Sequence, residues 1–302
     1  MANTTFSGPI RSENGMKRIS KNTTSGLISD RTVGDYPKDA RRWYLEEWFN
    51  RRPGLNANLD AAATTEVQRT LSYDFEALGT NMTSALVTFG ATTGGILATT
   101  AGADQDQAIV CPHLDNDGTA DTGAITAWSG CQWGTENETH WEPSIMLPAI
   151  DNQKVFCGLK LTGDANGQLV ATDADQAYFK FQTDATNSEA FTDFTKWHFV
   201  HSIGGTDFIS QLPITVAANT PYHLKITIDS DRKASIFVNG EQYNVTTTSG
   251  STGGTAVTTG TTPTAALTND VDFIPYNGIE AGAAAAEALN THFIAMSRLV
   301  FE

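Results

Sequence analysis

The sequence predicts a mostly-β protein, either a sandwich or a barrel, and three observations carry this prediction. Of the 302 residues only 18% are charged, and Thr, Gly, Asn and Ala take up the difference, which suits strands and turns better than helices. Short runs of apolar residues recur along most of the chain. Gly, Asn, Asp or Pro bounds each of these runs, and many short strands separated by turns are typical of sandwiches and barrels.

The expected strands lie between residue 67 and the end of the chain. They are residues 67–75, 85–89, 95–99, 108–111, 126–133, 155–161, 176–181, 197–203, 222–228, 234–238 and 291–301. The clearest segment is 222–240, where apolar residues alternate with polar ones from Tyr222 to Ile228 and a tight turn follows. The Asn-Gly pair at 239–240 then ends the second strand, so this segment predicts a hairpin followed by a reversal. Residues 246–265 are rich in Thr, Ser and Gly, and we expect a long exposed loop that can add a ribbon.

Charge is distributed unevenly along the chain. Residues 1–54 contain ten of the 19 basic residues and six of the 34 acidic residues, a net charge of about +4. Residues 55–302 contain nine basic and 28 acidic residues, a net charge of about −19. Such an asymmetry bears on partners and solubility, and not on fold. The acidic body argues against nucleic acid as a partner.

Composition divides the chain into three parts. We expect an N-terminal docking arm at 1–54, a linker at 55–69 and a β-sandwich domain at 70–302. The first 34 residues are polar and lack a sustained period, as in an extended arm. Pro37 suits a first helical turn, and the sequence Arg-Arg-Pro-Gly that begins at Arg51 suits a helix end, so we predict one short helix at about 37–50.

The predicted helix carries an aromatic face. Tyr44, Leu45, Trp48 and Phe49 fall at i, i+1, i+4 and i+5, which places them on one side of a helix. This face must be buried, either against the chain's own sandwich or against a partner subunit, where Trp, Tyr and Arg are favoured anchors. On the second alternative, the partner-binding residues are Arg41, Arg42, Tyr44, Trp48 and Phe49.

Neither a secretion signal nor a membrane span is visible in the sequence. The N-terminus lacks an apolar core region, and no apolar run approaches the length of a spanning helix. We therefore expect no membrane partner. The three cysteines, Cys111, Cys131 and Cys157, cannot all pair within one chain. Buried thiols are the simpler interpretation, with one disulfide as the alternative.

Two groups of segments resemble known families. The hairpin at 224–240, the lead-in residues Leu212-Pro213 and Asn219-Thr-Pro-Tyr, and the last strand up to Phe301 resemble concanavalin A-like (laminin G-like) jelly-roll sandwiches. This likeness covers about 70–302. The opening segment Asn-Thr-Thr-Phe-Ser-Gly-Pro-Ile-Arg-Ser-Glu-Asn-Gly, with residues 134–138, 158–162, 172–175 and 274–279, looks like virion structural proteins of marine tailed phages.

These resemblances imply a fold and a role. The implied fold is a mostly-β, concanavalin A-like jelly-roll sandwich with an N-terminal extended arm and one short helix. The implied role is a virion structural protein assembled in the host bacterial cytoplasm. We expect a capsid decoration or cement protein that its arm anchors to the major capsid protein, as a homo-oligomer for which a trimer suits threefold positions. The alternative is a carbohydrate-binding tail or head fibre protein that attaches to a host glycan.

The sequence argues against an enzyme. Jelly-roll glycoside hydrolases carry Glu-x-Asp-x-x-Glu on one strand, because two carboxylates must flank the glycosidic bond. Here Glu136 and Glu138 would share a strand face and Glu142 follows, but no third acid has the required spacing. Among the tryptophans, Trp128, Trp133 and Trp141 suit either core packing or sugar platforms.

No cofactor is expected, with one weak candidate for calcium. Asp115, Asp117 and Asp121 lie close together in an Asn- and Gly-containing segment, and calcium prefers several oxygen ligands on a flexible loop. The glycine comes too early for an EF-hand loop and the bidentate Glu is missing, so a simple turn is the alternative. His198 and His201 stand three apart on an expected strand, which puts them on opposite faces and argues against a shared metal.

Overall fold

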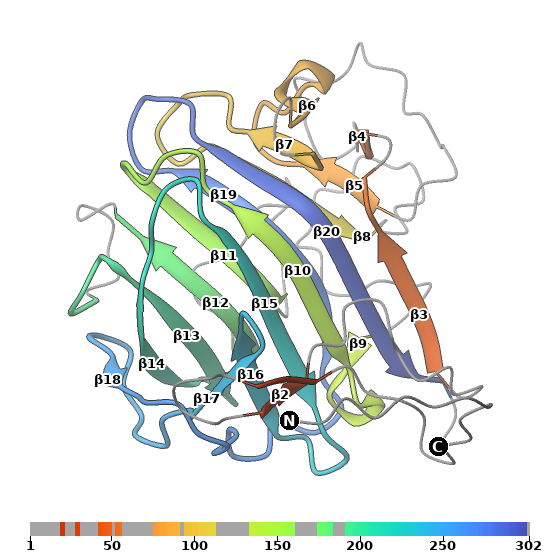
Figure 1. Cartoon of the computed structure of the whole chain (residues 1–302), viewed down its shortest axis with the longest axis vertical. Coiled ribbons are helices and arrows are strands. Elements are labelled where there is room, and N and C mark those ends of the chain that lie inside the picture. The colour runs from red at the N-terminus through yellow and green to blue at the C-terminus, as the bar shows by residue number, and fades with distance from the viewer. Residues whose placement is uncertain are drawn as a thin grey trace, which may run out of the picture.

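The strands of this protein form two large sheets that lie face to face (Figure 1). The computed structural model describes residues 19–21, 28–30, 42–49, 52–55, 75–90, 94–112, 133–160, 174–183 and 191–300. A separate ribbon consists of β1 (Ile19–Lys21) and β2 (Ile28–Asp30), which are antiparallel. Over these ranges no helix has the length and apolar character needed to cross a membrane.

The first sheet has eight strands. They are β3 (Arg42–Glu47), β6 (Val87–Phe89), β7 (Ile96–Thr99), β10 (His140–Met146), β15 (Pro221–Ile228), β16 (Ala234–Val238), β17 (Glu241–Tyr243) and β20 (Ala288–Leu299). Their order is β17-β16-β15-β10-β20-β7-β6, and β3 also pairs with β20. A short 3-10 turn, η3 (Ser84–Leu86), precedes β6.

The second sheet has ten strands. They are β4 (Gly54–Leu55), β5 (Phe75–Leu78), β8 (Gln107–Pro112), β9 (Trp133–Gly134), β11 (Gln153–Lys160), β12 (Gln176–Gln182), β13 (Lys196–Ile203), β14 (Thr206–Thr215), β18 (Thr255–Ala256) and β19 (Asp272–Ala281). Their order is β18-β14-β13-β12-β11-β19-β8-β5-β4, and β9 pairs with β19. A 3-10 turn, η4 (Thr135–Asn137), follows β9.

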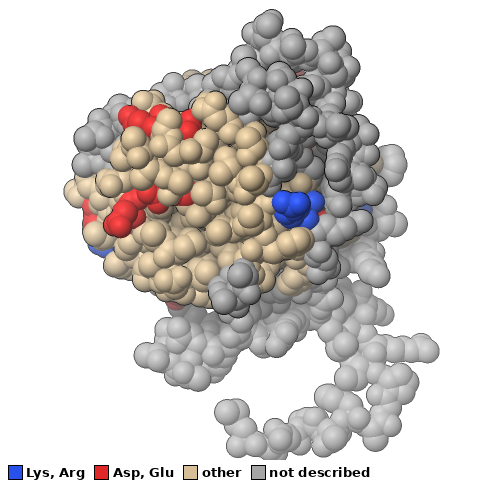
Figure 2. Space-filling model, turned by 90° about the horizontal axis from the view of Figure 1, so that it is seen from above, with Lys and Arg blue, Asp and Glu red and all other residues tan. Residues whose placement is uncertain are grey.

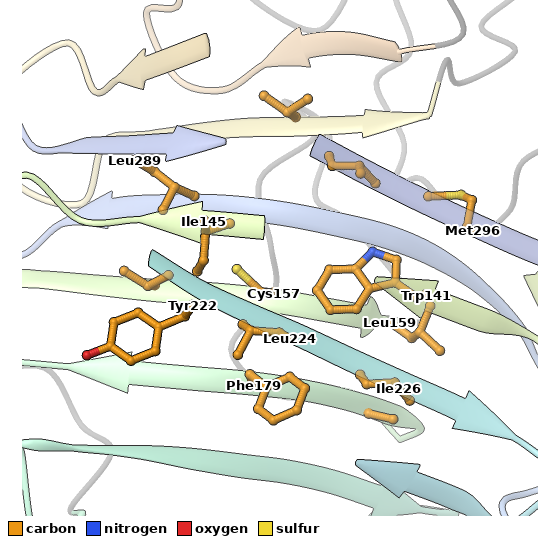
Figure 3. Packing of buried hydrophobic residues seen from close by; sticks show 14 of the residues in the cluster. Trp141, Ile145, Cys157, Leu159, Phe179, Tyr222, Leu224, Ile226, Leu289 and Met296 are labelled. Atoms are coloured by element: carbon orange, nitrogen blue, oxygen red, sulfur yellow. The ribbon is translucent and has the colours of Figure 1, made fainter. Parts of the chain in front are cut away.

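The core lies between the two sheets, because alternate residues of each strand point inward. Leu224 and Ile226 of β15 face Cys157 and Leu159 of β11 in one buried cluster, which Figure 3 shows from close by. Burial of each large apolar side chain contributes about 1.5–3 kcal/mol. The expected mostly-β sandwich is the observed fold class, with two large sheets around one core.

Most of the predicted strands are present, and the predicted hairpin is confirmed. Strands β15 and β16 pair antiparallel from Leu224↔Val238 to Ile228↔Ala234. Asn239 and Gly240 both take positive φ, 52° and 80°, as the Asn-Gly pair predicts. The sequence did not predict β10, β14 or β19, three strands in the middle or near the edge of the two sheets.

The predicted helix at 37–50 is wrong over Arg42–Glu47, since these residues form β3. This strand pairs antiparallel with β20 from Ile294↔Glu47 to Leu299↔Arg42, and the two run side by side in Figure 1. Leu45 points into the core, whereas Tyr44 and Glu46 point outward. Inward and outward side chains therefore alternate with a period of two residues, as in a β-strand. The aromatic residues fit a helical period as well, but they favour strands. With β3 and β4, part of the predicted docking arm belongs to the two sheets.

A segment rich in Thr closes one open side of the sandwich. We call residues 253–267 the closing segment. The Val257 N–H donates to the carbonyl of Gln211, at the edge of the ten-stranded sheet, over 2.9 Å. The Thr264 N–H donates to the carbonyl of Ala234 in the eight-stranded sheet, also over 2.9 Å. The stretch expected to be an exposed loop therefore adds the ribbon β18 and bridges both sheet edges.

Candidate functional site

Phe49, one of the predicted partner-binding residues, lies in the core of the sandwich. Its side chain is 2% exposed and meets Phe75 edge to face, with 6.0 Å between the ring centroids. A left-handed φ of 50° at Phe49 turns the chain inward after β3. The aromatic residue therefore packs on the chain's own sandwich, the first of the two alternatives. Arg41 lies outside the described residues.

Arg42 is fastened to the sandwich as well. Its Nη2 donates to the carbonyl oxygen of Glu138 over 2.6 Å and to Ser297 Oγ over 3.1 Å. Its Nη1 lies 3.5 Å from Glu138 Oε2, and the side chain is 8% exposed. These contacts tie the start of β3 to β20 and to the turn before β10. Tyr44, opposite Ser297 in the register, is half-buried on the outer face of the sheet.

Among the predicted partner-binding residues that the structure describes, Trp48 is the one that stays exposed. Its side chain is 49% exposed. One face of the indole stacks on Phe293 with 4.8 Å between ring centroids and 25° between the ring planes. The indole Nε1–H donates to the carboxylate of Glu46, which is exposed beside it. The ring is therefore fixed on one face and at its edge, and its other face is directed to solvent.

Phe293 begins a row of side chains across the outer face of the eight-stranded sheet. Phe293 of β20 is in register with Ser144 of β10, and Ser144 with His223 of β15. The rings of Phe293 and His223 are nearly parallel, with centroids 6.1 Å apart. Trp48 lies beyond Phe293 at the other end. We call Trp48, Phe293, Ser144 and His223 the Trp48 row.

A buried acid supports this row. Glu142 is 1% exposed, and its Oε1 lies 2.5 Å from Nε2 of His223. Among the described residues, no donor meets either carboxylate oxygen in hydrogen-bond geometry, so the close contact with the His223 imidazole is what compensates for burying this group. The contact also fixes the orientation of the His223 ring.

His140, which lies two residues before Glu142 on β10, carries no charge at neutral pH. Burial, and secondarily the positive charges of Arg42 and Lys225, lower the pKa of His140 to about 3. Lys225 itself lies over the ring of Phe237, 5.3 Å from the centroid. The outer face near the row thus combines aromatic rings, the exposed carboxylate of Glu46 and the buried carboxylate of Glu142, which contacts the His223 imidazole.

Buried polar chains cross the outer face of the ten-stranded sheet. Lys160 Nζ donates to Gln176 over 2.6 Å, Gln176 to Ser202 over 2.8 Å, and Ser202 to Asp207 over 2.5 Å. A second chain joins Lys154 and Gln107 through the two oxygens of Glu280, over 2.6 and 2.7 Å. Each chain links neighbouring strands, so these groups hold the sheet together.

The two histidines of β13 lie on opposite faces, as their spacing predicts. His198 stacks on Phe191 with 4.2 Å between centroids, and His201 stacks on Phe208 with 4.6 Å. Burial lowers the pKa of each to about 4. Across the described ranges, no group of three His, Cys, Asp or Glu side chains is arranged to hold a metal ion. The candidate calcium residues Asp115, Asp117 and Asp121 lie outside these ranges.

The carboxylates considered for glycoside hydrolysis do not share a strand. Glu136 lies in η4 and accepts a hydrogen bond from the Asp270 N–H over 2.6 Å. Glu138 follows in a left-handed conformation, φ 44°, and pairs with Arg42. The expectation that these two acids occupy one strand face is wrong, because a 3-10 turn replaces the strand.

Sequence reasoning named Trp48 but missed its neighbours. Trp133 and Trp141 are core residues, as one alternative held, while Trp128 lies outside the described residues. Glu142 and His223 stand far apart in the sequence, and only the pairing of β10 with β15 brings them together. Reading residues 42–48 with a period of two would have placed Glu46 and Trp48 together on the outer face.

No family model matches this sequence, and no curated protein matches it. Several solved structures are similar at low identity. A protein of unknown function from Shewanella oneidensis is 11% identical, with 86% of this chain and 87% of that chain covered and a TM-score of 0.47. Peanut lectin is 12% identical, with 86% and 99% covered and a TM-score of 0.44. A Bacillus licheniformis β-glucanase is 11% identical, with 84% and 97% covered and a TM-score of 0.44. At these identities and TM-scores the likeness concerns the overall fold alone and says nothing of this chain's function.

Proposed function

We propose that this chain is a non-catalytic structural protein of a tailed-phage particle, a decoration protein that its basic N-terminal segment anchors to the major capsid protein. The observation that carries the proposal is the charge asymmetry, about +4 over residues 1–54 against about −19 over the rest. Acidic side chains are exposed on the described surface in Figure 2. The resemblance of the opening residues to phage virion proteins supports the same role.

The anchor is shorter in this proposal than the arm defined from composition. Residues 42–47 pair with β20 and Phe49 is buried, so this part of the arm serves the sandwich. Residues 1–41 remain, with seven basic and four acidic residues. A basic segment that leaves an acidic body suits docking on an acidic surface of another protein, and electrostatic complementarity speeds such encounters.

Repetition on a capsid lattice lets weak individual contacts hold. A copy that binds a neighbouring copy as well as the lattice binds more tightly overall, because the second contact forms at a high effective concentration. We therefore propose a homo-oligomer, with a trimer at threefold positions as its simplest form. Assembly takes place in the cytoplasm of the host bacterium, and the partners are proteins, with no membrane and no nucleic acid.

A binding experiment with neutralised arm residues tests the anchor. We expect a variant with Gln at all seven basic positions of 1–41 to lose binding to particles that lack this protein, as measured by co-sedimentation. These positions are Arg11, Lys17, Arg18, Lys21, Arg31, Lys38 and Arg41. The binding of the unchanged protein should weaken as salt rises, because surface charges are screened within about 10 Å at 0.1 M.

The control neutralises basic residues of the body instead of the arm. Neutralising Lys196, Lys225 and Lys233 on the body should leave binding intact. Deleting all of 1–54 is unsuitable, because it removes β3 and Phe49 and so damages the sandwich. Full binding by the arm variant would refute the proposed anchor.

A further inference from the structure

We propose that Lys154 and Gln107 become joined by an amide bond after the chain has folded, in a reaction that the carboxylate of Glu280 promotes. The three side chains stand on the outer face of the ten-stranded sheet, on β11, β8 and β19. The inference does not depend on the anchoring role, because none of these residues lies in the 1–41 segment.

The register of three neighbouring strands brings these groups together. Strand β19 lies between β11 and β8. Glu280 is in register with Lys154 on one side and with Gln107 on the other, and residues in register share one face of a sheet. The Cα atoms of Lys154 and Gln107 are thus two strand spacings apart, roughly 10 Å. A lysine and a glutamine side chain joined end to end can cover this span.

A single carboxylate contacts both reacting groups. Lys154 Nζ donates to Glu280 Oε1 over 2.6 Å, and Gln107 Nε2 donates to Glu280 Oε2 over 2.7 Å. A group that transfers a proton must lie within about 2.6–3.2 Å of the atom that carries it. Glu280 meets this condition both for the nitrogen that attacks and for the nitrogen that leaves.

Burial shields the three groups from water. The Lys154 and Glu280 side chains are 12% and 10% exposed, and Gln107 is 4% exposed. A buried site keeps water from competing with the amine for the carboxamide carbon. The strands also hold the amine and the carboxamide in place, so the reaction needs no chance encounter.

The atoms of the reaction balance without a further reactant. Glu280 accepts a proton from Lys154 Nζ, and the freed electron pair attacks Cδ of Gln107. The Nζ–Cδ bond forms, Glu280 passes the proton to Nε2, and the Cδ–Nε2 bond breaks. The nitrogen leaves as ammonia and takes up the second proton of the amine, so ammonium is released. No atom is oxidised or reduced.

The new bond ties a strand of one sheet to the other sheet. Between residues 107 and 154 the chain passes through β10, which belongs to the eight-stranded sheet. A link between Gln107 and Lys154 therefore closes a loop that contains β10. A covalently closed loop restricts the unfolded chain, as a disulfide does, and so favours the folded state.

Mass spectrometry of the purified full chain tests the bond. We expect the intact mass to be lower than the sequence mass by one molecule of ammonia. Digestion after lysine and then after glutamate cuts the chain between positions 107 and 154, at Glu136, Glu138 and Glu142. Gln107 and Lys154 should nevertheless stay together in one branched peptide.

Three variants assign the roles. Glu280→Gln keeps both reacting groups and removes the proton transfer, and Lys154→Arg keeps a cation beside Glu280 but replaces the amine, so neither variant should lose ammonia. Lys160→Arg is the matched control, because Lys160 Nζ donates directly to a second carboxamide, Gln176 Oε1, over 2.6 Å. It should still lose ammonia at Lys154. The melting temperature of each variant shows whether it has folded.

Several outcomes overturn the proposal. An intact mass equal to the sequence mass excludes the bond, and a branched peptide in Glu280→Gln excludes the role of the carboxylate. A link from Lys154 to Gln182, its neighbour on β12, contradicts the assigned acceptor. Loss of ammonia at an Asn-Gly pair such as 239–240 marks a succinimide instead. None of these outcomes bears on binding to a particle, so failure here is distinct from failure of the decoration role.

Discussion

At the scale of single residues, Trp48 and Phe49 are adjacent in the chain, yet the first lies on the surface and the second in the core. Both are large aromatic residues at the end of β3, yet one is 49% exposed and the other 2% exposed. The left-handed φ of Phe49 turns its side chain into the core, where it meets Phe75. The sequence identified both as anchors but could not assign a partner to either, because the period of the segment fits a helix and a strand equally well.

Truncation of these two neighbours should therefore have unequal effects. We expect Phe49→Ala to lower the free energy of unfolding by about 3–5 kcal/mol, because it leaves a cavity beside Phe75. Trp48→Ala should cost about 1 kcal/mol or less, since its ring rests on a surface. Urea denaturation of both variants measures the difference. Equal losses would show that Phe49 is not a core residue.

Buried histidines should make the protein less stable in mild acid. Burial lowers the pKa of His201 to about 4, whereas an unfolded chain protonates near pH 6.5. Between pH 6.5 and pH 4, His201 is therefore protonated in the unfolded state but stays neutral in the folded state. The free energy of unfolding falls by about 1.4 kcal/mol per pH unit for such a group.

Replacing His201 isolates its contribution to the loss of stability with falling pH. His201→Phe keeps the stacking with Phe208 and removes the titration, so melting temperatures between pH 7 and pH 4 should fall less steeply than in the unchanged protein. The comparison is needed because burial raises the pKa of Asp272 and Glu287, which acts in the opposite direction. A slope identical in both proteins would contradict a neutral, buried His201.

At the scale of elements, the sequence predicted strands with clean alternation and missed those without it. The hairpin of β15 and β16 alternates strictly and was predicted with its turn. Strand β19 is buried on both faces and contains Pro275, Asn277 and Gly278, which are turn-forming residues elsewhere. Strand β3 alternates, but its aromatic residues also meet a helical period. Pairing with β20 makes residues 42–47 a strand, and a local sequence pattern does not reveal a pairing with so distant a segment.

Close packing of β11 on β12 should make Gly158 irreplaceable. A Cβ at Gly158 would lie 2.5 Å from Cα of Tyr178, in backbone with φ +155°. Gly158→Ala should therefore force the strands apart and cost about 1–3 kcal/mol or more. Gly250→Ala is the control, because its nearest contact would be the Thr252 oxygen at 3.8 Å. Comparable melting temperatures for the two variants would refute the close approach.

The closing segment depends on one asparagine. The Asn244 side chain accepts from the Thr262 N–H over 3.0 Å and donates to Thr258 Oγ1 over 3.3 Å. We expect Asn244→Ala to cost about 1–2 kcal/mol and to speed amide exchange across 255–263. Exchange mass spectrometry measures this, with the strands of the core as internal reference. Unchanged exchange in that segment would show that backbone bonds alone hold it.

At the scale of the whole molecule, the fold class followed from composition and strand spacing, while the candidate site did not. Two sheets around an apolar core need only alternating residues and turns, which the sequence displays. The Trp48 row needs Trp48, Phe293 and His223 side by side, and these residues come from three distant parts of the chain. Glu142 adds a fourth. Register between distant strands set this juxtaposition, so it could not be read from the sequence.

The number of copies in each particle tests the proposed role most directly. Quantitative mass spectrometry of purified particles, with the major capsid protein as reference, measures it. A decoration protein should be present in hundreds of copies, in a simple ratio to the capsid subunit. A few copies to a few tens would contradict decoration and favour a tail appendage, and none at all would exclude a virion role.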